Sequence, residues 1–223
     1  MDRDDLLLER LRYRARHPAL RFDTAFVAEK WMVDRYGQRE TWKFSRMGDG
    51  VQVPADSPYA QAFFADVPHY PAYGTATEQQ VAEAERILGQ RLPELLRRVY
   101  MEVANGGFGP GWHGFSSITD GYRDPWWDER SAVEACLEQR TYGLPDTWFH
   151  LAHGGCNMHW YVVLNEPDNP VHYFDWDGWD FRPDDPDLPP ELVQPIEVGI
   201  VETTPSLSEW LWHWAEGGMI VRD

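Results

Sequence analysis

Residues 77–107 constrain the fold more than any other part of the sequence, because they carry the start and stop signals of two consecutive helices. Thr77 and Gln80 have the spacing of a capping box, and Gly89 suits the C-terminal cap of the first helix. The apolar residues that share one face of this helix are Val81, Ala84, Ile87 and Leu88. A helix with such a face has to bury it against another layer of structure.

The second helix of this segment begins after the Leu92-Pro93 pair. Proline suits the first turn of a helix, where a missing N–H group costs no hydrogen bond. Arg98 and Glu102 stand one turn apart and can form an ion pair. The apolar residues expected to be buried are Leu95, Leu96, Val99, Tyr100 and Val103. The Asn-Gly-Gly sequence at 105–107 tolerates positive φ and suits a sharp exit, so folding alone explains the segment.

The residues before this segment are expected to form an N-terminal extension of helices and a hairpin. The expected elements are a helix at 4–16, a helix at 23–37 and a hairpin at 40–54. Three leucines lie on one side of the first helix, Gly37 ends the second, and a Gly-Asp-Gly turn centres the hairpin. Two prolines and a glycine within residues 66–75 mark a boundary, so the extension is predicted to comprise residues 1–74.

Residues 75–223 are predicted to form the second domain, with an antiparallel sheet and a closing helix. The expected strands are 147–155, 160–164, 171–174 and 194–202. The sequence NEPDNP joins the second and third strands as a hairpin. Ser206 and Glu209 have capping-box spacing ahead of leucines and tryptophans at helical spacing. This order of elements predicts an α+β fold with helices packed on an antiparallel sheet.

The net charge of −17 is concentrated in the C-terminal half of the chain. Residues 1–74 contain 11 basic and 11 acidic residues, whereas residues 120–223 contain 5 basic and 21 acidic ones. Such a field repels nucleic acid and attracts basic partners, although solubility alone would also account for it. The basic run RLRYRAR at 10–16 has acidic neighbours, so a solvated helix face or pairing with the acidic half is expected, and no nucleic-acid contact.

The sequence gives no sign of secretion or membrane insertion. Its start, MDRDDLLLERLRYR, has an acidic head rather than the basic head of a signal peptide, and no apolar run approaches the ~20 residues of a membrane span. Cys136 and Cys156 are the only cysteines, so no disulfide framework is indicated. We therefore expect a cytoplasmic protein without a membrane partner.

Short motifs along residues 75–218 occur in an order that is typical of a known family. They are Glu85 in the first helix, Leu88-Gly89, Leu92-Pro93 and Ala104–Gly107. The order continues in LAHGGCNMHWYVVLN, in the hairpin that ends with YFDWDG, and in the closing SLSEWLWHW. In these features the chain resembles the SMI1/KNR4 family, also called the SUKH superfamily.

The resemblance implies a protein-binding module rather than an enzyme. Members of the family are typically non-catalytic; many bacterial members are immunity proteins that neutralise toxins, and fungal members act as signalling adaptors. The most concrete expectation is an immunity protein whose acidic surface covers a basic toxin domain such as a nuclease. An intracellular regulatory adaptor is the alternative within the binding class.

The stretch HLAHGGCNMH contains His150, His153, Cys156 and His159, each three residues from the next. Imidazole and thiolate groups are ligands that zinc prefers. Two adjacent glycines disfavour the single helix on which the four residues would converge, and no second thiolate supports a site. A strand, a turn and a second strand are therefore expected, with no metal and no cofactor. A metal-dependent enzyme using His153, Cys156 and His159 is the alternative from another class.

The stretch DWDGWDFRPDDPDLPPE places two tryptophans within a run of acids. Its glycine and final acid do not fit the spacing of an EF-hand calcium loop. Tryptophan is favoured at binding hot spots, and carboxylates steer a basic partner. The predicted partner-binding residues are Asp175, Trp176, Asp177, Trp179, Asp180, Asp184, Asp185 and Asp187. The alternative is that both tryptophans turn inward and the acids are solvated.

Overall fold

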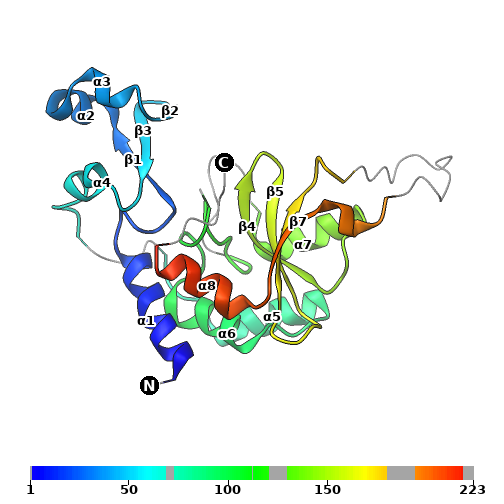
Figure 1. The fold of residues 1–223 in the computed structure, drawn as a ribbon. Helices are drawn as coiled ribbons and strands as arrows, with labels where there is room; N and C mark the ends of the chain where they lie inside the picture. Colours follow the sequence, from blue (N-terminus) through cyan, green and yellow to red (C-terminus); the bar gives the residue numbers. More distant parts are fainter. Residues whose placement is uncertain (1, 69–72, 112, 121–129, 180–193, 218–223) are drawn as a thin grey trace.

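The computed structural model describes residues 2–68, 73–111, 113–120, 130–179 and 194–217. A four-stranded antiparallel sheet in the order β4-β5-β6-β7 forms the C-terminal part (Figure 1). Its strands are β4 (Trp148–Gly155), β5 (Met158–Val163), β6 (Val171–Asp175) and β7 (Ile200–Thr204). The predicted strands and the hairpin between β5 and β6 are confirmed. The last strand begins later than predicted, because Pro195 opens a short 3-10 helix, η3 (Ile196–Gly199), before sheet pairing starts.

The helices share one hydrophobic core with this sheet. They are α5 (Glu78–Leu88), α6 (Glu94–Arg98), η1 (Val99–Val103), α7 (Ala132–Thr141) and α8 (Leu207–Ala215). From the sheet, Phe149, Leu151, Trp160 and Val162 enter this core. Helices packed on an antiparallel sheet make an α+β fold, as predicted.

The two predicted helices of residues 77–104 are confirmed, with a break at Leu92-Pro93. Thr77 and Gln80 form both contacts of the capping box, and Gly89 ends α5 in the left-handed conformation at φ 68°. Pro93 is the N-cap of α6 rather than a residue of its first turn. The second helix ends as a π-helix, η1, and Ile87 is 38% exposed although its spacing predicted burial.

The predicted sharp exit at residues 105–107 is also confirmed. Gly106 and Gly107 have φ values of 84° and 74°. A Cβ atom on Gly106 would lie 2.7 Å from the Ser117 nitrogen, so a side chain would not fit there. The Asn105 side chain accepts a hydrogen bond from the Ile118 N–H at 2.8 Å. These contacts fold the following loop back against the helices.

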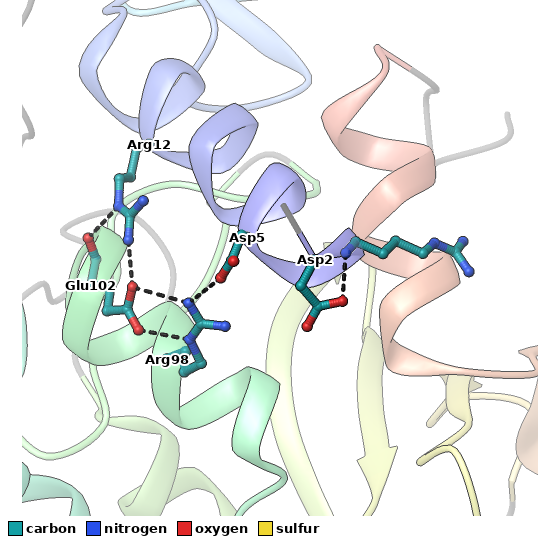
Figure 2. A network of polar contacts seen from close by, with 6 residues as sticks. Asp2, Asp5, Arg12, Arg98 and Glu102 are labelled. Carbon is teal, nitrogen blue, oxygen red and sulfur yellow. Dashed lines mark hydrogen bonds and ion pairs between the residues drawn. The ribbon is translucent and has the colours of Figure 1, made fainter.

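Helix α1 (Arg3–Arg16) belongs to the same core although it precedes the predicted boundary at residue 74. Its buried leucines are Leu7, Leu8 and Leu11, and it lies beside α8 in Figure 1. Figure 2 shows the polar contacts that connect it to Arg98 of α6 and Glu102 of η1. Arg98 pairs with Glu102 at 2.7 Å, as predicted, and with Asp5 at 2.9 Å, while Arg12 donates to the Glu102 carbonyl at 3.0 Å.

Residues that lie between α1 and α5 in the sequence form a second, smaller core, in the blue and cyan part at the upper left of Figure 1. Its elements are β1 (Thr24–Ala28), α2 (Glu29–Tyr36), α3 (Gln38–Thr41), β2 (Arg46–Met47), β3 (Gly50–Pro54) and α4 (Pro58–Phe63). The predicted hairpin is confirmed as β2 and β3, although Glu40 and Thr41, at the start of the predicted range, belong to α3. The predicted 23–37 helix is wrong in its first part, because Thr24–Ala28 pairs with β3 and alternates in burial as a strand. Helix α2 then ends before Gly37, as expected.

Asp23 joins the smaller core to the larger one. Its carboxylate accepts hydrogen bonds from the Gly111 N–H at 2.7 Å and from the Trp214 indole N–H at 2.9 Å. Its backbone N–H donates to the Gly111 carbonyl, and its carbonyl accepts from Ala55. Arg14 lies over the Trp214 ring, 4.2 Å from its centroid. Burial raises the pKa of Asp23 to about 6, against the opposing effects of these hydrogen bonds and of Arg14.

Candidate partner-binding surface

The predicted binding residues begin where β6 ends, and the first of them build a tight turn. The Asp175 carboxylate accepts a hydrogen bond from the Asp177 N–H at 2.9 Å, and the Asp177 carboxylate accepts one from Asn157 at 2.9 Å. Both acids therefore support the local backbone as well as contributing charge. Four further predicted residues, Asp180, Asp184, Asp185 and Asp187, lie outside the described residues.

The two tryptophans of this turn point toward the sheet. Trp179 is 5% exposed, and its ring centroid lies 5.5 Å from that of Phe174. Its indole N–H donates to the Gln194 carbonyl at 3.2 Å. Trp176 is half-buried and donates to the Tyr161 hydroxyl at 2.9 Å. This arrangement matches the alternative in which the rings turn inward, and whether the acids around them contact a partner stays a prediction.

The histidines of the β4–β5 hairpin form a buried row on the sheet face opposite the helices. The register pairs His153 with His159, and the His150 Nε2 atom lies 2.9 Å from the His159 Nδ1 atom. Desolvation lowers the pKa of His159 well below its usual value, and the neighbouring imidazoles and Arg130 lower it further. The His159 ring is therefore neutral at physiological pH, as a ring within a hydrogen-bonded core would be.

Cys156 is not part of this buried row. It is exposed at the hairpin turn, with φ 45°, while His153 and His159 are buried. Within the described ranges, no group of three or more His, Cys, Asp and Glu side chains has the arrangement of a metal site. The geometry thus gives no support to the alternative of a metal enzyme that uses His153, Cys156 and His159.

A pocket that the sequence analysis did not predict opens between β6, β7 and α8, with a volume of about 390 Å³. We call it the β7–α8 groove. Its lining residues are Trp160, Val171, Tyr173, Glu202, Thr203, Thr204, Pro205, Glu209, Trp210 and His213. Three of them form one row across the sheet, because the register pairs Trp160 with Tyr173 and Tyr173 with Glu202. Burial decreases along this row from the tryptophan to the glutamate.

Aromatic rings form the inner wall of the β7–α8 groove. Trp160 stacks on Tyr173 with centroids 4.7 Å apart and an interplanar angle of 22°. Trp210 of α8 lies 6.0 Å from Trp160 and is 2% exposed. A Cβ atom on Gly154 would lie 2.7 Å from the Tyr173 ring, so glycine leaves the room that this stack occupies. Burial raises the pKa of Tyr173, so its phenol stays protonated.

Two carboxylates form the outer rim of the groove. Glu202 comes from β7 and Glu209 from the first turn of α8, where the Ser206 hydroxyl caps the helix by accepting from the Glu209 N–H at 3.1 Å. Both side chains are exposed, and neither has an ion-pair partner in the part of the chain that the structure describes. The groove could not be predicted from the sequence, because its residues come together only through the register of the paired strands.

Comparison with known protein families identifies the family of this chain. The part of the chain that the structure describes contains no helix with the length and apolar composition of a membrane span. A comparison with curated proteins gives no match. The model of the SMI1 / KNR4 family (SUKH-1) matches residues 75–211, which include the two-helix segment, the sheet and most of α8. The chain therefore belongs to the SMI1/KNR4 family (SUKH-1).

Proposed function

We propose that this protein acts without catalysis, as an immunity protein that binds and neutralises a basic bacterial toxin domain. Two lines of support come together. The chain belongs to a family in which, as the sequence resemblance implies, many bacterial members are immunity proteins. The acidic excess of residues 120–223 supplies the electrostatic field that a basic partner such as a nuclease would follow.

The observation that carries the proposal is the different use of charge in the two parts of the chain. Two buried or half-buried arginines of the helical part are paired internally: Arg98 with Glu102 and Asp5, and Arg97 with Glu85 at 2.7 Å. Exposed acids of the β5–β6 turn, the β6 turn, η3, β7 and α8 have no ion-pair partner among the residues described. They are Glu166, Asp168, Asp177, Glu197, Glu202 and Glu209. The negative field is therefore left available for another molecule.

The direct test is to search the neighbouring genes for a basic toxin domain and to co-express this protein with it. We expect the protein to restore growth and to form a complex with that domain in size-exclusion chromatography. The association rate should fall as salt rises, because screening weakens steering beyond the Debye length of about 8 Å at physiological ionic strength. Continued growth arrest with no complex would contradict the proposal.

A triple variant tests whether the predicted acids at positions 184, 185 and 187 steer the partner. Changing Asp184, Asp185 and Asp187 together to asparagine removes three charges from the proposed steering surface. We expect slower association and a weaker salt dependence, with little change in dissociation. A variant with wild-type rates at low and high salt would place the interface away from this loop.

A further inference from the structure

We propose that the β7–α8 groove is the recognition pocket for an arginine side chain of the basic partner. The guanidinium would stack on Tyr173 and pair with Glu202 and Glu209. This inference rests on the proposed function, because it names the chemical group by which the partner is recognised. At about 390 Å³, the groove lies near the lower end of the range of roughly 300–1,000 Å³ for ligand pockets.

The aromatic wall suits a flat cation. Trp160 stacks on one face of the Tyr173 ring, Tyr173 lines the groove, and Glu202 on β7 is the cross-strand partner of Tyr173. A cation over the face of an aromatic ring is attracted by the quadrupole of the ring. A guanidinium is planar and weakly hydrated, and it stacks on such faces more readily than an ammonium group.

The two carboxylates complete the chemistry of the pocket. They come from separate elements, β7 and α8, so their positions on the rim are set by the packing of α8 on the sheet. Neither is neutralised by an ion pair within the described ranges. The five N–H donors of a guanidinium can serve two carboxylates at once, whereas a smaller ammonium group has three donors. His213 also lines the groove.

The test uses NMR titration of the full chain with a Gly-Arg-Arg-Gly peptide whose two ends are blocked. We expect saturable shifts of the β7 amides and of the Trp160 and Trp210 indole signals. Replacing both arginines by citrulline keeps the shape and removes the charge, and it should abolish these shifts. A lysine version of the peptide should bind at least several-fold more weakly, because it lacks the planar group.

A matched pair of variants separates the groove from the general negative field. The test variant is Glu202→Gln with Glu209→Gln, and the control is Glu166→Gln with Asp168→Asn in the β5–β6 turn. Both variants remove two exposed charges that have no ion-pair partner among the described residues. We expect the groove variant to weaken peptide binding about tenfold and the control to weaken it less than about twofold. Equal losses, absent shifts, or equal binding of the citrulline or lysine peptide would overturn the proposal.

The same variants distinguish this inference from the proposed function. If the groove variant still neutralises the toxin domain as the wild type does, the immunity role stands and the arginine pocket is wrong. If the peptide occupies the groove as expected but no toxin domain is neutralised, the pocket stands and the immunity role is wrong.

Discussion

At the β6 turn, where Asp175 and Asp177 lie close in sequence, Trp176 and Trp179 turn toward the sheet, and their indole N–H groups donate to the Tyr161 hydroxyl and the Gln194 carbonyl. At the β7–α8 groove, Tyr173 is half-buried and borders an open pocket whose rim carries two exposed carboxylates, Glu202 and Glu209. Both regions combine aromatic rings with acids. In the turn the rings complete the fold, whereas in the groove they leave a surface that a ligand can reach.

The two regions differ because the aromatic rings pack against different residues. Trp179 follows β6 closely enough to cover Phe174, and together with Trp148 and Tyr161 it closes the sheet face opposite the helices. Tyr173 points to the other face, near the sheet edge, where Trp210 of α8 packs near Trp160 and the β7–α8 groove leaves part of Tyr173 accessible. A dense run of tryptophan and aspartate is therefore weak evidence for an interface until the position of the rings is known.

The variant with the largest expected effect is Trp179→Ala, which tests whether the Trp179 ring stabilises the fold. Because the ring is 5% exposed and packs on Phe174, its removal should lower the free energy of unfolding by about 3–5 kcal/mol. Urea denaturation measures this loss. The control is Trp42→Ala, since Trp42 is 64% exposed and should contribute little.

Equal stabilities of these two variants would mean that the turn is not held by Trp179. The ring would then be free to act as the interface anchor that the sequence predicted. In that case the Trp179→Ala variant should bind the toxin domain with faster dissociation at unchanged stability.

Asp23 differs from the acids of the groove rim because it is buried, and we expect its burial to make the stability of the protein depend on pH. Its pKa is about 6 in the folded protein and near the ordinary value of 3.8 when unfolded, so the folded state holds the proton more strongly. Stability from this group is fully present below about pH 4 and is lost as pH rises through about 6. Two pKa units correspond to a loss on the order of 3 kcal/mol.

Urea denaturation of Asp23→Asn between about pH 4 and 7 isolates this effect. The variant should lose the part of the pH dependence that Asp23 causes, although its stability at acidic pH is lower because asparagine cannot accept both hydrogen bonds. Asp56→Asn, at an exposed acid, is the matched control and should keep the wild-type slope. Identical slopes in the two variants would show that Asp23 is ionised without cost in the folded state.

Much of the fold could be predicted because its signals are local. The Thr77 capping box, Gly89 and the break at Pro93 each specify backbone conformation within a few residues. Helix α7 was not predicted although Ser131 and Glu134 form a capping box, because its buried face includes Gln139 while Leu137 is exposed. Strand β1 was assigned to a helix because only its pairing with β3 distinguishes the two.

The candidate site was harder to predict, because its residues meet only through tertiary structure. Tyr173, Glu202 and Glu209 come from three elements, and the row across the sheet depends on register. The inward position of Trp179 likewise depends on Phe174 and on the Gln194 carbonyl, which lies 15 residues away in the sequence. The acidic excess was visible from the sequence, but the places where it meets accessible aromatic surface were not.

The smallest expected change in stability is that of the two variants at the rim of the groove. Glu202→Gln and Glu209→Gln should each change the free energy of unfolding by less than about 0.5 kcal/mol, because both side chains are exposed and unpaired among the residues described. Glu209 lies in the first turn of α8, where a negative charge is favourable, so its variant should be the less stable of the two.

Thermal and urea unfolding of the two single variants measure these small changes against wild type. A loss above about 1 kcal/mol would mean that a rim carboxylate supports the fold, as Asp175 does through its bond to the Asp177 N–H. Near-wild-type stability would leave both carboxylates without a structural task, at the edge of a pocket whose inner wall is aromatic. Groups that the fold does not need, in a position that a partner can reach, are the ones whose charge is available for recognition.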